Sequence, residues 1–127
     1  IANEWLMMRP YIGDHVVYPD GGTGKTTVPK KLAQICTPEE AAILKEMMVG
    51  VVENGTGGAA SVSGVTVAGK TGTAENATGN DHSWFIGFAP AEEPKVAIAV
   101  LLENANDGNA SAIAGKVLRA ALEEMGE

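Results

Sequence analysis

The chain has 127 residues, of which 45% are hydrophobic and 20% are charged, and its net charge is −7. This length allows one modest domain with a hydrophobic core of its own. The acidic balance argues against a nucleic-acid-binding protein, which would normally present a basic face.

The first 36 residues carry little periodicity. Residues 1–10 predict the end of a helix that stops before Pro10, because the residue before a proline disfavours helical geometry. The stretch YPDGGTGKTT, residues 18–27, is rich in turn formers and predicts an exposed loop or irregular hairpin. The chain has no initiator Met and begins in mid-pattern, so we interpret it as a piece of a longer protein.

A helix is predicted to begin after Thr37. Thr37 suits the N-cap, Pro38 the first helical position, and Glu40 completes a capping box. Asn54-Gly55 is a fitting stop. An apolar stripe is expected to face the core, and it consists of Ile43, Leu44, Met47, Met48, Val51 and Val52.

Three strands and a second helix are predicted to follow a flexible connection at residues 55–64. The strands are residues 65–75, 83–90 and 95–104, and the short links between them indicate an antiparallel meander. The third strand is apolar at successive positions, so we expect it to be central and covered on both faces. Its apolar run, residues 96–102, is too short to span a bilayer. The helix is expected at residues 109–125, with a buried face of Ile113, Val117, Leu118, Ala121, Leu122 and Met125.

The predicted fold is therefore α/β of the α+β type, with an antiparallel sheet flanked by helices, and part of the sheet is expected to lie upstream. Cys36 is the only cysteine, so an intrachain disulfide and a cysteine-cluster metal site are both excluded. His15 and His82 have no ligand-like spacing, and we expect neither a metal nor a cofactor.

Two stretches combine lysine, threonine and glycine. The first, GGTGKTTV at residues 21–28, contains Gly24-Lys25-Thr26, which is how a phosphate-binding loop ends. That motif needs a glycine where Pro19 stands, and Pro29 would cut short the helix that must follow. We expect a solvated loop here, and Mg²⁺-dependent ATP binding would favour the phosphate-loop alternative.

The second stretch is VAGKTGTAEN, residues 67–76. Glycine weakens a strand unless something must approach the backbone, and Gly72 would let a ligand lie along the strand edge. Lys70 adds a cation, and the hydroxyls of Thr71 and Thr73 lie two residues apart on one face. These groups suit an extended peptide that ends in a carboxylate and pairs with the edge. A glycine bulge with an exposed lysine explains the same residues equally well.

A family resemblance favours the first of these two explanations. AGKTGTAE, followed by HSWFIGFAP and PKVAIAVLLEN, resembles the C-terminal part of the transpeptidase domain of class B penicillin-binding proteins. MMVGVVENGTGGAA and ANEWLMMRPY resemble the segments just upstream, so the resemblance covers nearly the whole chain.

The resemblance implies a peptidoglycan D,D-transpeptidase, which binds penicillin and cross-links stem peptides ending in D-Ala-D-Ala by serine acyl transfer. Lys70 would supply positive charge beside the substrate carboxylate and tune the catalytic groups. Thr71 and Thr73 would hydrogen-bond that carboxylate, Gly72 would keep the edge open, and the Thr73 N–H would be an oxyanion-hole donor. Glu75, Asn76 and His82 would lie at the rim. Trp84 would either line the cleft or, as we expect, lie in the core.

The chain lacks two motifs that the family requires. Neither S-x-x-K, which carries the nucleophile, nor S-x-N occurs around the four serines Ser61, Ser63, Ser83 and Ser111. Residues 1–127 are therefore expected to be the C-terminal portion of one transpeptidase domain, with the nucleophile in the upstream part. Isolated from that part, the apolar stripe and one sheet edge would be partly uncovered.

Other members of the same superfamily remain open as alternatives. A β-lactamase or a D,D-carboxypeptidase would use the same strand, and a non-catalytic binding or scaffold module could retain it after losing the serine. By resemblance, the parent protein would act at the outer face of the bacterial cytoplasmic membrane. It would carry its membrane anchor outside this chain.

Overall fold

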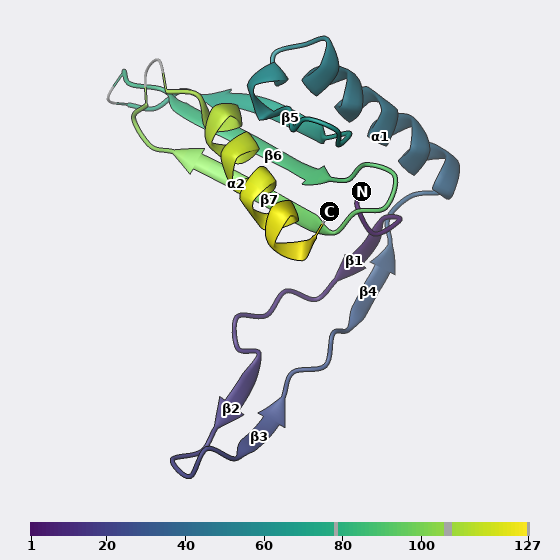
Figure 1. Cartoon of the computed structure of the whole chain (residues 1–127), viewed down its shortest axis with the longest axis vertical. Coiled ribbons are helices and arrows are strands. Elements are labelled where there is room, and N and C mark those ends of the chain that lie inside the picture. Colours follow the sequence, from purple (N-terminus) through teal and green to yellow (C-terminus); the bar gives the residue numbers. More distant parts are fainter. Residues whose placement is uncertain (78, 106–107, 127) are drawn as a thin grey trace.

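In the described residues, a three-stranded sheet, two α-helices, a short 3-10 turn and a projecting arm of two small two-stranded sheets make up the molecule (Figure 1). The computed structural model describes residues 1–77, 79–105 and 108–126. The sheet consists of β5, β6 and β7, which span Ala68–Ala74, His82–Ala89 and Val96–Leu102. The helices are α1 (Pro38–Glu53), the 3-10 turn η1 (Gly58–Ala60) and α2 (Ala110–Met125). The arm contains β1 (Leu6–Met8), β2 (His15–Val17), β3 (Thr23–Thr26) and β4 (Lys31–Gln34).

The sheet is an antiparallel meander in the order β5-β6-β7, which confirms the predicted topology. In the described residues β6 lies between its two neighbours and β7 pairs only with β6, so within this chain the third strand is not the central one that we expected. Burial alternates along β7, so only one of its faces is covered. In a three-stranded meander the middle strand is necessarily the central one, whatever its neighbours' hydropathy.

The larger of two core clusters lies between the sheet and α2. Phe85 of β6 and Leu118 and Leu122 of α2 are almost completely buried there. The predicted α2 face is right for these two leucines, but Ile113, Val117 and Met125 are substantially exposed. The helix instead buries a row of small residues that allows close approach, namely Ala110, Ser111, Ala114 and Gly115.

Helix α1 begins as predicted, with a capping box. The Glu40 N–H donates to Thr37 Oγ1 at 3.3 Å, and the Thr37 N–H donates to the Glu40 carboxylate at 2.8 Å. Asn54 is the C-cap. Only part of the apolar stripe is core: Met48 and Val52 are buried, whereas Ile43 is 55% and Met47 63% exposed. The expectation that this stripe is partly uncovered in the isolated chain is therefore confirmed.

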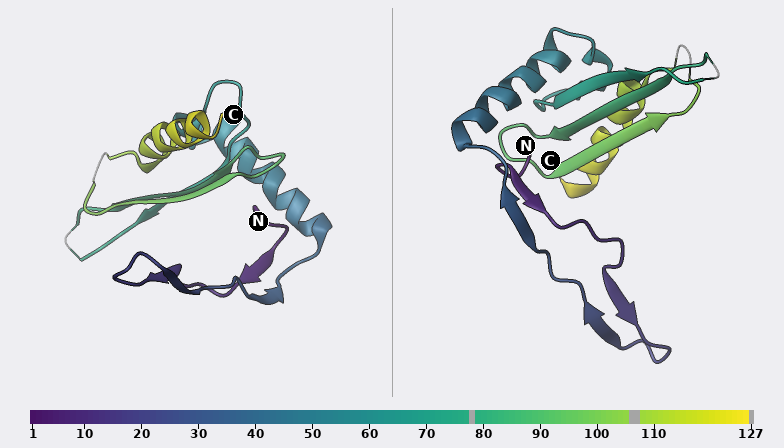
Figure 2. Two further views of the ribbon diagram at one scale, coloured as in Figure 1. Left: turned by 60° about the horizontal axis from the view of Figure 1, so that its bottom comes forward. Right: turned by 180° about the vertical axis from the view of Figure 1, so that it is seen from behind.

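The arm corrects one prediction and confirms another. Residues 1–10 are not the end of a helix, because a turn leads into β1, which pairs antiparallel with β4. The irregular hairpin predicted at residues 18–27 is present as β2 and β3, with a register shift between them. Figure 2 shows that the arm lies on the side of the sheet opposite α2.

Helix α1 covers one end of that side, where Met48, Ala68 and Phe88 are buried together, and the rest of it is exposed. Trp84, Ile86 and Leu101 project from it and are 39%, 47% and 40% exposed. Within the described part of the chain, no helix has the length and apolarity needed to cross a membrane.

Candidate active site

The second Lys-Thr-Gly stretch lies on β5, at the edge of the sheet. In the described residues, β5 pairs only with β6, and an edge strand presents unpaired backbone N–H and C=O groups to a ligand. Backbone N–H and C=O groups of residues two apart in a strand point to the same side of that strand. The backbone groups of Thr71 and Thr73 therefore point to the same side of β5. The strand edge that the sequence predicted is thus present.

The strand register divides the motif between the two faces of the sheet. Thr71 and Thr73 pair with Phe85 and Ser83, so their side chains share one face, as predicted, and it is the face covered by α2. Lys70 and Gly72 belong to the opposite face. The Lys70 ammonium donates a hydrogen bond to the Thr71 carbonyl oxygen, which holds the cation close to the strand edge.

A cavity of about 360 Å³ adjoins β5, and it is unusually rich in hydroxyl groups. Thr71, Gly72 and Thr73 line it, and Lys70 does not. Trp84 also lines it and is 39% exposed, so the expectation of a core tryptophan is wrong. The remaining lining residues are Thr56, Ser83, Gly108, Asn109 and Ser111.

Thr56 is a site residue that the sequence did not reveal. Its hydroxyl lies 2.7 Å from the Thr71 hydroxyl, and either oxygen can donate. The loop that carries it is fixed by the next residue, because the N–H of the buried Gly57 donates to the Val51 carbonyl at 2.9 Å. Thr56 lies fifteen residues before Thr71, and no local pattern signals that this loop returns to the strand.

The two glycines of β5 have different explanations. A Cβ at Gly69 would lie 2.2 Å from Phe85 Cζ, so the core requires a glycine there. A Cβ at Gly72 would meet only Trp84 Cβ at 3.4 Å, which is an ordinary contact. Packing within the described residues therefore accounts for Gly69 but does not require a glycine at position 72.

Asn76 and His82, expected at the rim, hold the end of the sheet together. The Asn104 N–H donates to His82 Nδ1 at 2.9 Å, and Asn76 Nδ2 donates to Asn104 Oδ1 at 3.0 Å. These bonds join the β5–β6 connection to the end of β7. Both residues thus support the strands that carry the motif.

The first Lys-Thr-Gly stretch has no phosphate-loop geometry. Gly24, Lys25 and Thr26 belong to β3, and extended chain leads from there to β4 instead of a helix. Among the residues that the structure describes, no group of three or more His, Cys, Asp or Glu side chains is arranged to hold a metal ion.

Comparison with known proteins shows which family this chain resembles. The model of the penicillin binding protein transpeptidase domain matches residues 1–123. Peptidoglycan D,D-transpeptidase PbpA of Mycolicibacterium smegmatis is 42% identical over 111 residues, which cover 84% of this chain and 22% of the relative. PbpA of Mycobacterium tuberculosis is 41% identical over 130 residues, which cover 97% of this chain and 26% of the relative. The chain thus spans about a quarter of these relatives' length.

Solved structures have the same fold. The D,D-transpeptidase domain of a peptidoglycan glycosyltransferase from Eggerthella lenta superposes with a TM-score of 0.87 at 42% identity, over 98% of this chain and 30% of that one. Penicillin-binding protein A from M. tuberculosis, solved as an imipenem acyl-enzyme complex, superposes with a TM-score of 0.78 at 40% identity. The superposition covers 99% of this chain and 28% of that one.

Proposed function

This chain belongs to the penicillin-binding protein transpeptidase family, and we propose that residues 1–127 are the C-terminal portion of a peptidoglycan D,D-transpeptidase domain. One observation carries this proposal: Lys70, Thr71, Gly72 and Thr73 lie on an open sheet edge beside a hydroxyl-lined cavity, and packing does not require Gly72. The upstream part of the same domain supplies the serine nucleophile and its lysine base, because no S-x-x-K occurs in these residues.

The edge of β5 binds the stem peptide as an added strand. The terminal D-Ala carboxylate accepts hydrogen bonds from Thr71 and Thr73, and the Lys70 ammonium stabilises its charge. Thr56 makes this arrangement favourable, because when its hydroxyl donates to Thr71 Oγ1 at 2.7 Å, the Thr71 proton is free for the carboxylate. In that direction of the bond, Thr71 donates to the carboxylate and Thr56 donates to Thr71.

Acyl transfer takes place at the penultimate D-Ala carbonyl. The serine oxygen forms a bond to this carbon, the terminal D-Ala leaves with a proton, and an amine of a second stem peptide later displaces the serine. The Thr73 N–H and the N–H of the nucleophile hold the oxyanion, and the loss of one such donor typically slows a reaction about 10²–10³-fold.

β-Lactams are proposed to occupy the same edge, because they carry a carboxylate next to a reactive carbonyl. A relative solved as an imipenem acyl-enzyme complex supports this assignment. We propose that the parent protein acts at the outer face of the cytoplasmic membrane, because a peptidoglycan D,D-transpeptidase must reach the cell wall. Any membrane anchor would lie outside these residues.

A longer protein that includes the upstream part tests the proposal. It is incubated with a synthetic stem peptide ending in D-Ala-D-Ala and an amine acceptor, and the products are separated by mass. A transpeptidase yields a cross-linked dimer, whereas D-Ala release without a dimer indicates a carboxypeptidase, and turnover of penicillin indicates a β-lactamase. A folded protein that yields none of these products is the non-catalytic binding or scaffold module, and the proposal is then wrong.

A further inference from the structure

The arm carries a charge opposite to that of the rest of the chain. Residues 6–35 hold four of the nine cationic side chains but only two of the sixteen acidic ones, which leaves them at net +2 and all other residues at −9. An anionic ligand is therefore repelled by most of the molecule and attracted by this segment.

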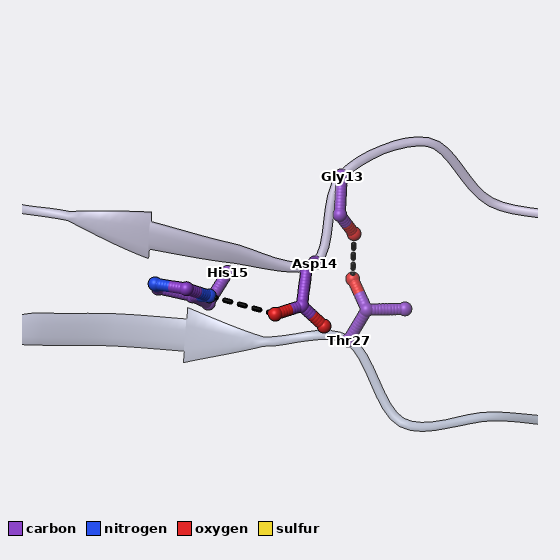
Figure 3. Close-up of polar contacts among 4 residues, drawn as sticks. All are labelled: Gly13, Asp14, His15 and Thr27. Atoms are coloured by element: carbon purple, nitrogen blue, oxygen red, sulfur yellow. Dashed lines mark hydrogen bonds and ion pairs between the residues drawn. The ribbon is translucent and has the colours of Figure 1, made fainter. Parts of the chain in front are cut away.

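The two strands of the arm separate midway between their paired ends. On one side of the opening, the Arg9 N–H donates to the Lys30 carbonyl at 2.8 Å. On the other side, the Thr27 N–H donates to the Asp14 carbonyl at 2.6 Å and Thr27 Oγ1 donates to the Gly13 carbonyl at 2.5 Å (Figure 3). Pro10 and Pro29 lie between these ties and have no N–H with which to close the ladder.

This opening is a cavity of about 340 Å³ with a basic lining. Arg9, Lys25 and Lys30 line it, together with the ring of Tyr11 and the residues Thr26 and Thr27. None of the three cations forms an ion pair with another described residue.

The two acidic side chains of the arm do not neutralise the cavity. The Asp14 carboxylate lies 2.8 Å from His15 Nδ1 (Figure 3), and the Asp20 carboxylate accepts the Gly22 N–H at 2.9 Å. Neither of them lines the cavity. Three cations therefore face a common space without a counter-charge on the described part of the chain.

We infer that this cavity binds a carboxylate of an uncross-linked peptidoglycan peptide and gives the substrate polymer a second contact away from the acylation site. The arm and the face of β5 that bears Lys70 lie on the same side of the sheet, opposite α2 (Figure 2). One polymer can therefore approach both cationic sites from that side. The identity of the polymer rests on the proposed function, whereas the anion site rests on the arm alone.

The test uses a longer protein that contains the upstream part, treated first with penicillin G so that the acylation site is blocked. Binding of a soluble disaccharide-pentapeptide with free carboxylates is measured by NMR titration of the arm amides at low and high salt. The same probe with its carboxylates amidated and a glycerol-phosphate polymer serve as comparison ligands. The variants are Arg9→Gln, Lys25→Gln and Lys30→Gln, singly and combined, and Lys31→Gln is the matched control. Lys31 is an exposed cation of the same arm that does not line the cavity.

Each single substitution is expected to weaken binding about two- to fivefold, and the combined variant about tenfold or more, because partly exposed ion pairs contribute modestly. High salt should weaken binding of the peptide probe to the unaltered protein and barely change its binding to the combined variant. The inference is overturned if the combined variant binds normally, if Lys31→Gln weakens binding as much as the cavity substitutions do, or if the amidated probe binds equally well. It is also overturned if only the phosphate polymer binds. Penicillin acylation is recorded in the same experiment, so failure of the proposed function is visible separately from failure at the arm.

Discussion

Gly115 provides a sharp test of how α2 holds the site together. A Cβ at this position would lie 2.8 Å from the Ala59 carbonyl oxygen and 3.0 Å from Ala60 Cα, and these backbone atoms can give way only if η1 moves. In an open helix, alanine is favoured over glycine by about 1 kcal/mol. Because the contacts are with backbone atoms, overpacking here should cost about 2–3 kcal/mol, in the upper part of the usual range. After the helix-propensity gain of about 1 kcal/mol is subtracted, Gly115→Ala should destabilise the chain by about 1–2 kcal/mol.

Gly50 in α1 is the matched control. No atom lies within 4 Å of the Cβ that Gly50→Ala would add, so this change should stabilise the chain by about 0.5–1 kcal/mol. Thermal unfolding followed by circular dichroism should show Tm about 4–8 °C lower for Gly115→Ala and about 2–4 °C higher for Gly50→Ala. If both substitutions raise Tm, α2 does not contact η1 as closely as described, and the reasoning is refuted.

The remaining predictions concern the site, acid stability and association. Thr56→Val in the longer protein should slow penicillin acylation about three- to tenfold, because one hydrogen bond is lost, whereas Thr56→Ser should retain the rate. Equal acylation rates for the two variants would contradict the role of the Thr56 hydroxyl. The hydrogen bond from Thr66 is the main cause that lowers the pKa of the Glu92 carboxyl. This bond therefore stabilises the folded chain at neutral pH, and the stabilisation is lost as the pH falls through the lowered pKa of Glu92. The Tm difference between the unaltered chain and Thr66→Val should therefore shrink from neutral pH to about pH 3, and a constant difference would refute the linkage. Ile43→Lys with Met47→Glu should reduce self-association of the isolated chain in sedimentation velocity, because both side chains are more than half exposed; unchanged association would place the contact elsewhere.

Local signals in the sequence predicted the elements that local chemistry determines. The capping box at Thr37 and Glu40 uses contacts three residues apart, so α1 begins at the predicted place. The short links between strands led correctly to the meander, since an antiparallel neighbour is the simplest partner for a strand a few residues away.

Elements that depend on distant partners were predicted poorly. Residues 6–8 form a strand because they pair with residues 31–34, and no local pattern in residues 1–10 reveals this pairing. The buried face of α2 was assigned by large apolar side chains, but the close approach to η1 selects small ones such as Gly115. Trp84 was expected in the core, yet it projects from a part of the sheet face that the described residues leave uncovered.

The candidate site shows the same division. Lys70, Thr71, Gly72 and Thr73 are contiguous, so the motif itself indicated the strand edge. Thr56 reaches Thr71 only because α1 and η1 bring a distant loop back to β5. A hydroxyl in a glycine-rich loop is too common to single out from sequence alone.

Intact-mass analysis of the longer protein incubated with penicillin tests the central claim most directly. The unaltered protein and two variants, Lys70→Ala and Lys25→Ala, are compared over time. The account predicts a stoichiometric covalent adduct on the unaltered protein and on Lys25→Ala, and an adduct that forms about 10²-fold more slowly on Lys70→Ala, because the positive charge that stabilises the carboxylate of penicillin is lost. No adduct on the folded, unaltered protein, or equal rates for the two lysine variants, would contradict it.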